Sequence, residues 1–143
     1  MSQIIVCERT GAWAAAIRRH LPEGVRLRQI RALAECAGEL REAPASLLAL
    51  ELAPHNIEAV LELAGGLGRK FPQARALIFA DRQLAGYQAL LAEAGAIYFT
   101  CSPRELQGLT AIVRNHLSRL SEGSTSFAAQ VWDELPWDKN AVA

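Results

Sequence analysis

The stretch RALIFADRQLAGYQALLAEAGAIYFTC, residues 75–101, decides the fold. It begins with an apolar run at 75–80, continues with an amphipathic segment at 83–94 and ends with a second apolar run at 96–101. Short apolar runs of this kind are typical of strands buried on both faces, whereas the middle segment has the composition of a helix. Two parallel strands need a crossover between them, and a helix supplies it. The stretch therefore predicts a strand–helix–strand unit.

The same alternation continues toward both ends of the chain. Further strands are predicted at 3–7, 25–30 and 46–52. Helices are predicted after Thr10, over 32–42, from Asn56 to the run Gly65-Gly66-Leu67-Gly68, and over 103–120. Repeated strand–helix units build a parallel sheet with helices on both faces. We therefore expect an α/β protein with one doubly wound, five-stranded domain over residues 1–120.

Composition argues against several classes of protein. The 143 residues carry 15 Lys and Arg against 15 Asp and Glu, so binding to nucleic acid through bulk charge is not expected. No apolar run approaches the roughly 20 residues of a membrane span, and the N-terminus lacks the pattern of a signal peptide. Cys7, Cys36 and Cys101 form no close pair, which argues against a disulfide framework or a zinc knuckle. A cytoplasmic protein without a membrane segment is expected.

Residues 121–143 differ in composition from the rest of the chain. Ser, Gly and Thr at 121–126 predict a linker. The apolar residues that follow are Phe127, Val131, Trp132, Leu135 and Trp137. Because tryptophan is enriched at the energetic centres of interfaces, these residues indicate a docking segment. The segment could dock on its own domain, on a second subunit or on another protein.

The region before the last predicted helix carries a recognisable pattern. Ala94-Gly95-Ala96 precedes the fifth strand, and Ser102-Pro103 follows it. Together with the five strand–helix units, this pattern resembles the receiver domain of bacterial response regulators over roughly residues 3–120. The resemblance implies a flavodoxin-like sheet with strand order 2-1-3-4-5.

The resemblance also implies where the phosphorylation site of the family would fall. Cys7 and Glu8 take the positions of the acidic pair, Leu50 or Glu51 that of the acceptor aspartate, Ala80 that of the hydroxyl residue, Ser102 that of the lysine and Pro103 that of the cis-proline. Magnesium binding and phosphoryl transfer need two carboxylates in the pair, an aspartate and a lysine, and at most one carboxylate of the pair, Glu8, remains here. The expectation is a degenerate receiver, a pseudo-receiver without catalytic activity or cofactor.

Two functions are compatible with such a domain. The first is a protein-interaction module in signalling, with a protein partner or a homodimer contact at Tyr87, Leu91, Tyr98, Phe99 and Arg104. The second is a sensor that binds a small ligand or a metal ion at Cys7, Glu8, Glu51 and Cys101, with His55 nearby. Glu51 is either a built-in mimic of the phosphorylated state or an ordinary charge beside a loop.

Two histidines have simple structural explanations. His20 and His116 lie near the ends of predicted helices, so we expect them to be solvated or to interact favourably with the helix dipole.

Overall fold

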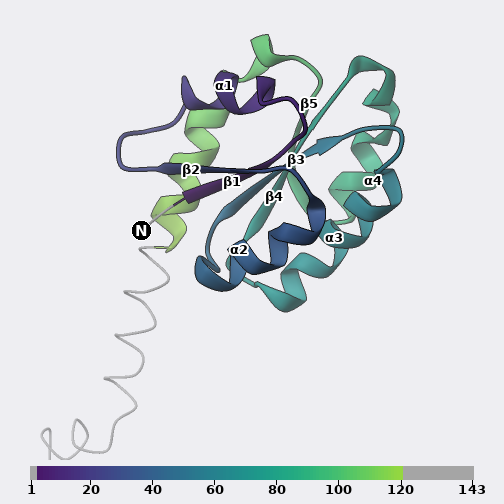
Figure 1. The fold of residues 1–143 in the computed structure, drawn as a ribbon. Coiled ribbons are helices and arrows are strands. Elements are labelled where there is room, and N and C mark those ends of the chain that lie inside the picture. Colours follow the sequence, from purple (N-terminus) through teal and green to yellow (C-terminus); the bar gives the residue numbers. More distant parts are fainter. Residues whose placement is uncertain (1–2, 121–143) are drawn as a thin grey trace, which may run out of the picture.

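The computed structural model describes residues 3–120 and contains one parallel sheet. Its strands are β1 (Gln3–Cys7), β2 (Arg26–Ile30), β3 (Leu47–Leu52), β4 (Arg75–Ala80) and β5 (Ala96–Thr100). They lie in the order β2-β1-β3-β4-β5 (Figure 1). The predicted fold class and strand order are therefore confirmed.

Helices cover both faces of the sheet (Figure 1). One face carries α1 (Ala12–Arg18) and the helix over residues 109–120, and the other carries α2 (Cys36–Glu42), α3 (Ile57–Lys70) and α4 (Gln88–Glu93). Short 3₁₀ segments occur at η1 (Leu33–Glu35), η2 (Arg82–Tyr87) and η3 (Pro103–Glu105). In this part of the chain no helix is long and apolar enough to cross a membrane. The predicted linker and docking segment at 121–143 lie outside the described residues.

The core consists of two apolar clusters, one on each side of the central strands. Alternate residues of β1 and β3 divide between them: Ile5 and Leu48 belong to the cluster under α2 and α3, whereas Ile4 and Leu47 belong to the cluster under α1. All four side chains are almost fully buried. Burial on both faces explains why these strands are continuous apolar runs in the sequence.

The glycine run at 65–68 does not end the third helix, as the sequence predicted. The helix α3 continues through it to Lys70, because Val60, Ala64 and Leu67 form a buried stripe at helical spacing. Packing of this stripe offsets the roughly 1 kcal/mol that each helical glycine costs relative to alanine. Phe71 is the C-cap of the helix, and Pro72, which follows it, cannot continue the helix.

The environment of His116 also differs from the one predicted. It is buried on the helix over 109–120, and its Nε2 lies 2.7 Å from the carbonyl oxygen of Ala45. Burial lowers the pKa of the imidazole, and the nearby Arg75 and Arg119 lower it further, although the bond to Ala45 opposes this. The side chain therefore joins the C-terminal helix to the loop between α2 and β3.

Candidate functional site

The carboxyl ends of β1 and β3 meet at one edge of the sheet, where doubly wound folds bind their ligands. Cys7 at the end of β1 is in register with Leu50 of β3, and Leu50 is in register with Ile78 of β4. The topology therefore brings together the residues that the sequence predicted for the acidic pair and the acceptor.

Glu8 follows β1 directly and is buried against the start of α1. One carboxylate oxygen accepts a hydrogen bond from the Trp13 backbone N–H at 2.9 Å, and the other accepts from the Ala14 N–H. Gly11, with a φ of +88°, makes the turn that aims these N–H groups at the carboxylate. Glu8 therefore caps a helix whose first N–H groups would otherwise lack partners.

Leu50 and Glu51, the two candidates for the acceptor position, have different environments. Leu50 is fully buried in the core beneath α2 and α3. Glu51 is half-buried, and its Oε1 accepts a hydrogen bond of 3.3 Å from the backbone N–H of Arg9. Of the two, only Glu51 reaches the cavity at this edge.

The cavity at this edge has a volume of about 270 Å³. The charged and titratable residues in its lining are Cys7, Glu8, Arg9, Arg31, Glu51 and His55. The loop beneath it is fixed by Asn56, whose Oδ1 accepts from the Ala53 N–H at 2.8 Å and whose Nδ2 donates to the Glu51 carbonyl at 2.9 Å. Acidic and basic groups thus share one small, preformed cavity.

Cys101 does not line this cavity. It follows β5, which is separated from β1 by β3 and β4, or about 14 Å at the usual strand spacing. Among residues 3–120 no group of three or more His, Cys, Asp or Glu side chains could hold a metal ion. Cys101 therefore does not belong to the pocket that the sensor hypothesis formed from Cys7, Glu8, Glu51 and Cys101.

The thiol of Cys7 contacts Cys36 instead, a pair that the sequence analysis missed. Hydrogen bonding to Cys36 lowers the pKa of Cys7, although burial opposes this, and the same bond raises the pKa of Cys36. Both side chains are buried, and Cys36 is the first residue of α2. The residues lie far apart in the sequence, so only the packing of α2 on β1 brings them together.

The ends of β4 and β5 carry the remaining predicted positions. Ala80 is buried and has no hydroxyl group. The Ser102 Oγ accepts a hydrogen bond of 3.2 Å from the Arg104 N–H and so caps the 3₁₀ segment at Pro103. No cis peptide bond occurs among residues 3–120, so the cis-proline implied at Pro103 is wrong. Neither Ser102 nor Pro103 lines the cavity beside Glu51.

The face formed by α4 and β5 is the second predicted site. Arg104 is exposed, and Tyr87, Tyr98 and Phe99 are half-buried. The Tyr98 hydroxyl donates to the Glu105 carbonyl at 2.8 Å, and burial raises the pKa of this side chain. Leu91 is fully buried, so its prediction as a surface contact is wrong.

Leu90 and Ile97 are the exposed large apolar residues in the described part of the chain, and the sequence analysis missed both. They are 45% and 44% exposed. The predicted helix over 83–94 is in fact a 3₁₀ segment followed by α4, and the change from 3.0 to 3.6 residues per turn alters which leucine faces the core. Ile97 lies in an irregularity between β4 and β5, where Ala76 is in register with Ala96 but Leu77 is in register with Tyr98. A residue inserted in this way is unpaired and is turned outward.

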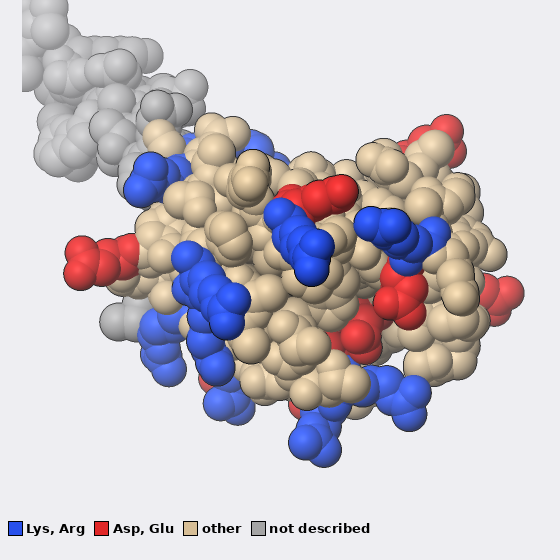
Figure 2. All heavy atoms as spheres, turned by 90° about the horizontal axis from the view of Figure 1, so that it is seen from above, with Lys and Arg blue, Asp and Glu red and all other residues tan. Residues whose placement is uncertain are grey.

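Charged side chains of both signs lie over the face of the molecule seen from above (Figure 2). On β2, an edge strand, Arg26 and Arg28 are exposed, and Arg28 Nε lies 3.2 Å from Glu39 Oε1 of α2. An exposed pair of this kind contributes little stability, typically about 0–1 kcal/mol. The mixture of signs agrees with the formal net charge of zero.

Comparison with known proteins bears on the fold. No protein-family model matches the chain, and no curated protein sequence matches it. Among solved structures, it is similar to a CheY-like protein, TadZ from Pseudomonas aeruginosa PAO1, with a TM-score of 0.64 and 18% sequence identity. The match covers 79% of this chain and 93% of the other. The chain has a receiver-like fold.

The receiver-like fold confirms part of the resemblance drawn from Ala94-Gly95-Ala96 and Ser102-Pro103. The cavity beside Glu51 is lined by Cys7, Glu8 and Glu51, which the sequence resemblance assigned to the positions of the family's phosphorylation site. At an identity of 18% the likeness bears on architecture, and the chemistry of this edge must be argued from the side chains that are present.

Proposed function

We propose that this chain is a pseudo-receiver, a protein-interaction module in signalling that neither accepts nor transfers a phosphoryl group. The observation that carries the proposal is the use of Glu8, a carboxylate beside the would-be acceptor, as an internal cap for α1. A carboxylate bonded in this way has little capacity left for magnesium, whose sites depend on one or two free carboxylates.

The other positions support the same proposal. Leu50 has no nucleophile and is fully buried. Glu51 accepts a bond from the Arg9 N–H, and Ser102, at the position of the family's lysine, caps a 3₁₀ segment and does not line the cavity, whose positive charges are Arg9 and Arg31. Phosphoryl transfer depends on positioned positive charge more than on any covalent chemistry of the protein. Ala80 adds no hydroxyl.

The interaction surface proposed for this module is the α4–β5 face, with Leu90 and Ile97 as its apolar centre. Both side chains are nearly half exposed although each costs free energy in water. Since β5 is an edge strand, its outer side is also open to a partner. The partner proposed is a protein, with a second copy of this chain as the first to be tested.

Phosphoryl transfer is tested by incubating the full chain with acetyl phosphate and magnesium and measuring its intact mass. We expect no added phosphoryl group under conditions in which a phosphorylatable receiver, run in parallel, is labelled. Peptide mapping would locate any adduct. A stable phosphoryl adduct on Glu51 or on a neighbouring side chain would overturn the proposal.

The interaction surface is tested with Leu90→Glu and the matched control Ala89→Glu. Both residues are exposed on α4 and both variants add one negative charge, but only the first removes the apolar contact. We expect Leu90→Glu to weaken self-association, measured by sedimentation, while Ala89→Glu leaves it near the wild-type level. Equal behaviour of the two variants would exclude Leu90 from the interface.

A second candidate function is supported by the cavity beside Glu51. Its volume of about 270 Å³ and its arginine and carboxylate lining could hold a small polar ligand between Arg9, Arg31 and Glu51. A thermal-shift screen with nucleotides and divalent metal ions tests this function. A dose-dependent rise in melting temperature that Arg31→Ala abolishes would favour the sensor over the interaction module.

A further inference from the structure

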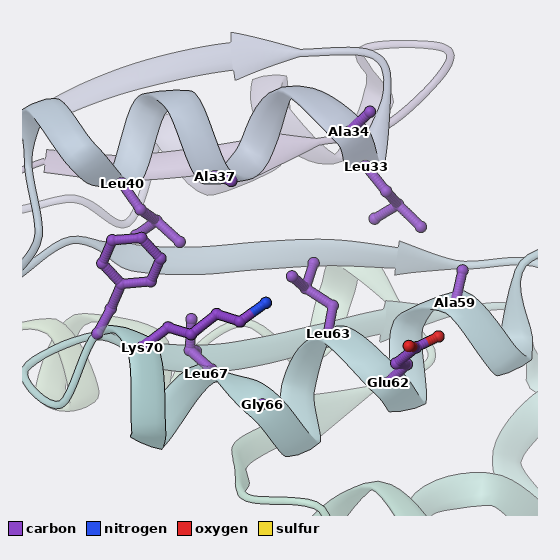
Figure 3. A pocket seen from close by; sticks show the side chains of 11 residues that line it. Leu33, Ala34, Ala37, Leu40, Ala59, Glu62, Leu63, Gly66, Leu67 and Lys70 are labelled. Atoms are coloured by element: carbon purple, nitrogen blue, oxygen red, sulfur yellow. The ribbon is translucent and has the colours of Figure 1, made fainter.

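A groove between α2 and α3 shares Leu33 with the cavity beside Glu51 but is otherwise lined by different residues (Figure 3). It is about 300 Å³ in volume and is lined mainly by apolar side chains. The larger ones are Leu33, Leu40, Leu63, Leu67 and Phe71. Between them the small residues Ala37 and Gly66 leave the floor open, and the groove has room for one or two aromatic side chains.

The two ends of the groove differ in charge. Figure 3 shows Glu62 near the end that contains Leu33 and Ala59, and Lys70 at the end that contains Leu40. Arg69 and Lys70 lie in the last turn of α3. The last turn of α3 is therefore basic, whereas α2 carries Glu39 and Glu42 close to Leu40 in the sequence.

The described chain ends beside this basic turn. Leu120 and His116 share a small surface hollow with Pro72 and Gln73, and Pro72 directly follows Phe71 of the groove. The contact of His116 with Ala45 attaches the same helix to the loop that leaves α2. The C-terminal helix thus reaches the loops that follow both helices of the groove.

We propose that this groove is the docking site of the segment 127–137 of the same chain. The segment supplies aromatic groups of the right kind, Phe127, Trp132 and Trp137, and buried aromatic side chains dominate the energetics of such contacts. Asp133 and Glu134 complement the basic end of α3. The inference is independent of the phosphoryl chemistry discussed above.

The chain is long enough for this contact. Twelve residues separate Leu120 from Trp132 and can span at most about 40 Å when fully extended. The helix α3 has 14 residues, so the groove beside it is no longer than about 21 Å. Even a partly helical connection therefore reaches the groove within one molecule.

The test compares Gly66→Glu with Gly65→Glu in the full chain. Gly66 lines the groove and Gly65 does not, and a side chain added at either position meets open space. Both variants replace a helical glycine with the same acidic residue, so helix propensity and net charge change equally. Only Gly66→Glu fills the groove and repels the acidic segment.

The readout is ¹⁹F NMR of the chain labelled with fluorotryptophan, which reports separately on Trp13, Trp132 and Trp137. Trp13 is buried against Phe79, with 5.0 Å between the ring centroids, and serves as an internal control of folding. We expect Gly66→Glu to shift the Trp132 and Trp137 signals toward that of free fluorotryptophan while Trp13 is unchanged. Gly65→Glu should leave all three signals in place.

Dilution distinguishes docking within one chain from docking on a second copy. We expect the wild-type Trp132 and Trp137 signals to stay constant over a tenfold dilution. If they move on dilution, the occupant is a second copy and the proposal is wrong, as it is if Gly66→Glu leaves them unchanged. If Gly66→Glu disturbs Trp13, a double variant with Trp132→Ala and Trp137→Ala is used in its place. Between the wild type and this double variant, the backbone amide signals of Leu63 and Gly66 must then shift more than that of Gly65.

Discussion

The carboxyl edge of the sheet and the α4–β5 face differ in whether their side chains have partners. At the edge, Glu8 and Glu51 accept bonds from backbone N–H groups, and no buried polar side-chain atom within residues 3–120 lacks a partner. On the α4–β5 face, by contrast, Leu90 and Ile97 remain exposed and apolar. The proposed pseudo-receiver needs this difference, because it uses the α4–β5 face for binding and has no phosphoryl chemistry at the carboxyl edge.

The largest effect is expected from Glu8→Ala. The substitution removes the acceptor of two backbone N–H groups at the start of α1 and leaves them buried. Bonds to a charged group contribute about 1.5–3 kcal/mol each, so we expect the loss of both to lower the free energy of unfolding by roughly 3–6 kcal/mol in urea titrations. Glu8→Gln keeps the shape and one acceptor and should lose less. A change within about 0.5 kcal/mol for Glu8→Ala would show that the cap is unimportant.

A smaller effect is expected from the pH dependence of His116. Its pKa in the folded protein lies below the ordinary value of 6.5, so the unfolded chain binds the proton more readily. The contribution of His116 to stability is complete above that ordinary value and is lost as the pH falls through it toward the lower folded pKa. As the pH falls below about 6.5, we expect wild-type stability to fall more steeply than that of His116→Gln. Parallel pH profiles of the two proteins would contradict this account of His116.

The smallest effect on stability is expected from Leu90→Glu. Because the side chain is 45% exposed, its replacement should change the free energy of unfolding by no more than about 0.5 kcal/mol. Leu90→Glu would then weaken self-association with almost no effect on stability, whereas Glu8→Ala would lower stability strongly. A loss of stability comparable to that of Glu8→Ala would place Leu90 in the core of the fold and remove it from the proposed surface.

The sheet could be predicted from the sequence because its signal is local. Apolar runs such as 46–52 and 75–80 are buried on both faces, and Pro54 follows the first while Asp81 follows the second. Local sequence patterns could not predict whether Leu50 or Glu51 reaches the cavity. Leu50 and Glu51 fit the resemblance in two registers, and only the pairing of β3 with β1 and β4 decides which one is buried.

The features that the sequence did not predict depend on distant contacts or on a change of backbone period. Cys36 meets Cys7 and His116 meets Ala45 only because separate elements lie side by side. Leu91 faces the core and Leu90 faces outward because the 3₁₀ segment before α4 changes the direction in which the following helical residues point. Ile97 is exposed by an irregularity in strand pairing, for which the run AIYFT carries no local signal.

The central claim is that the carboxyl edge no longer responds to a phosphoryl group, and one NMR titration tests it most directly. Beryllofluoride with magnesium imitates a phosphoryl group bound to a carboxylate and is added to the ¹⁵N-labelled full chain. The account predicts no saturable shift at Cys7, Glu8, Glu51 or Ser102. Saturable shifts at these residues that spread to Leu90 and Ile97 would contradict it, because they would show a working receiver site coupled to the α4–β5 face.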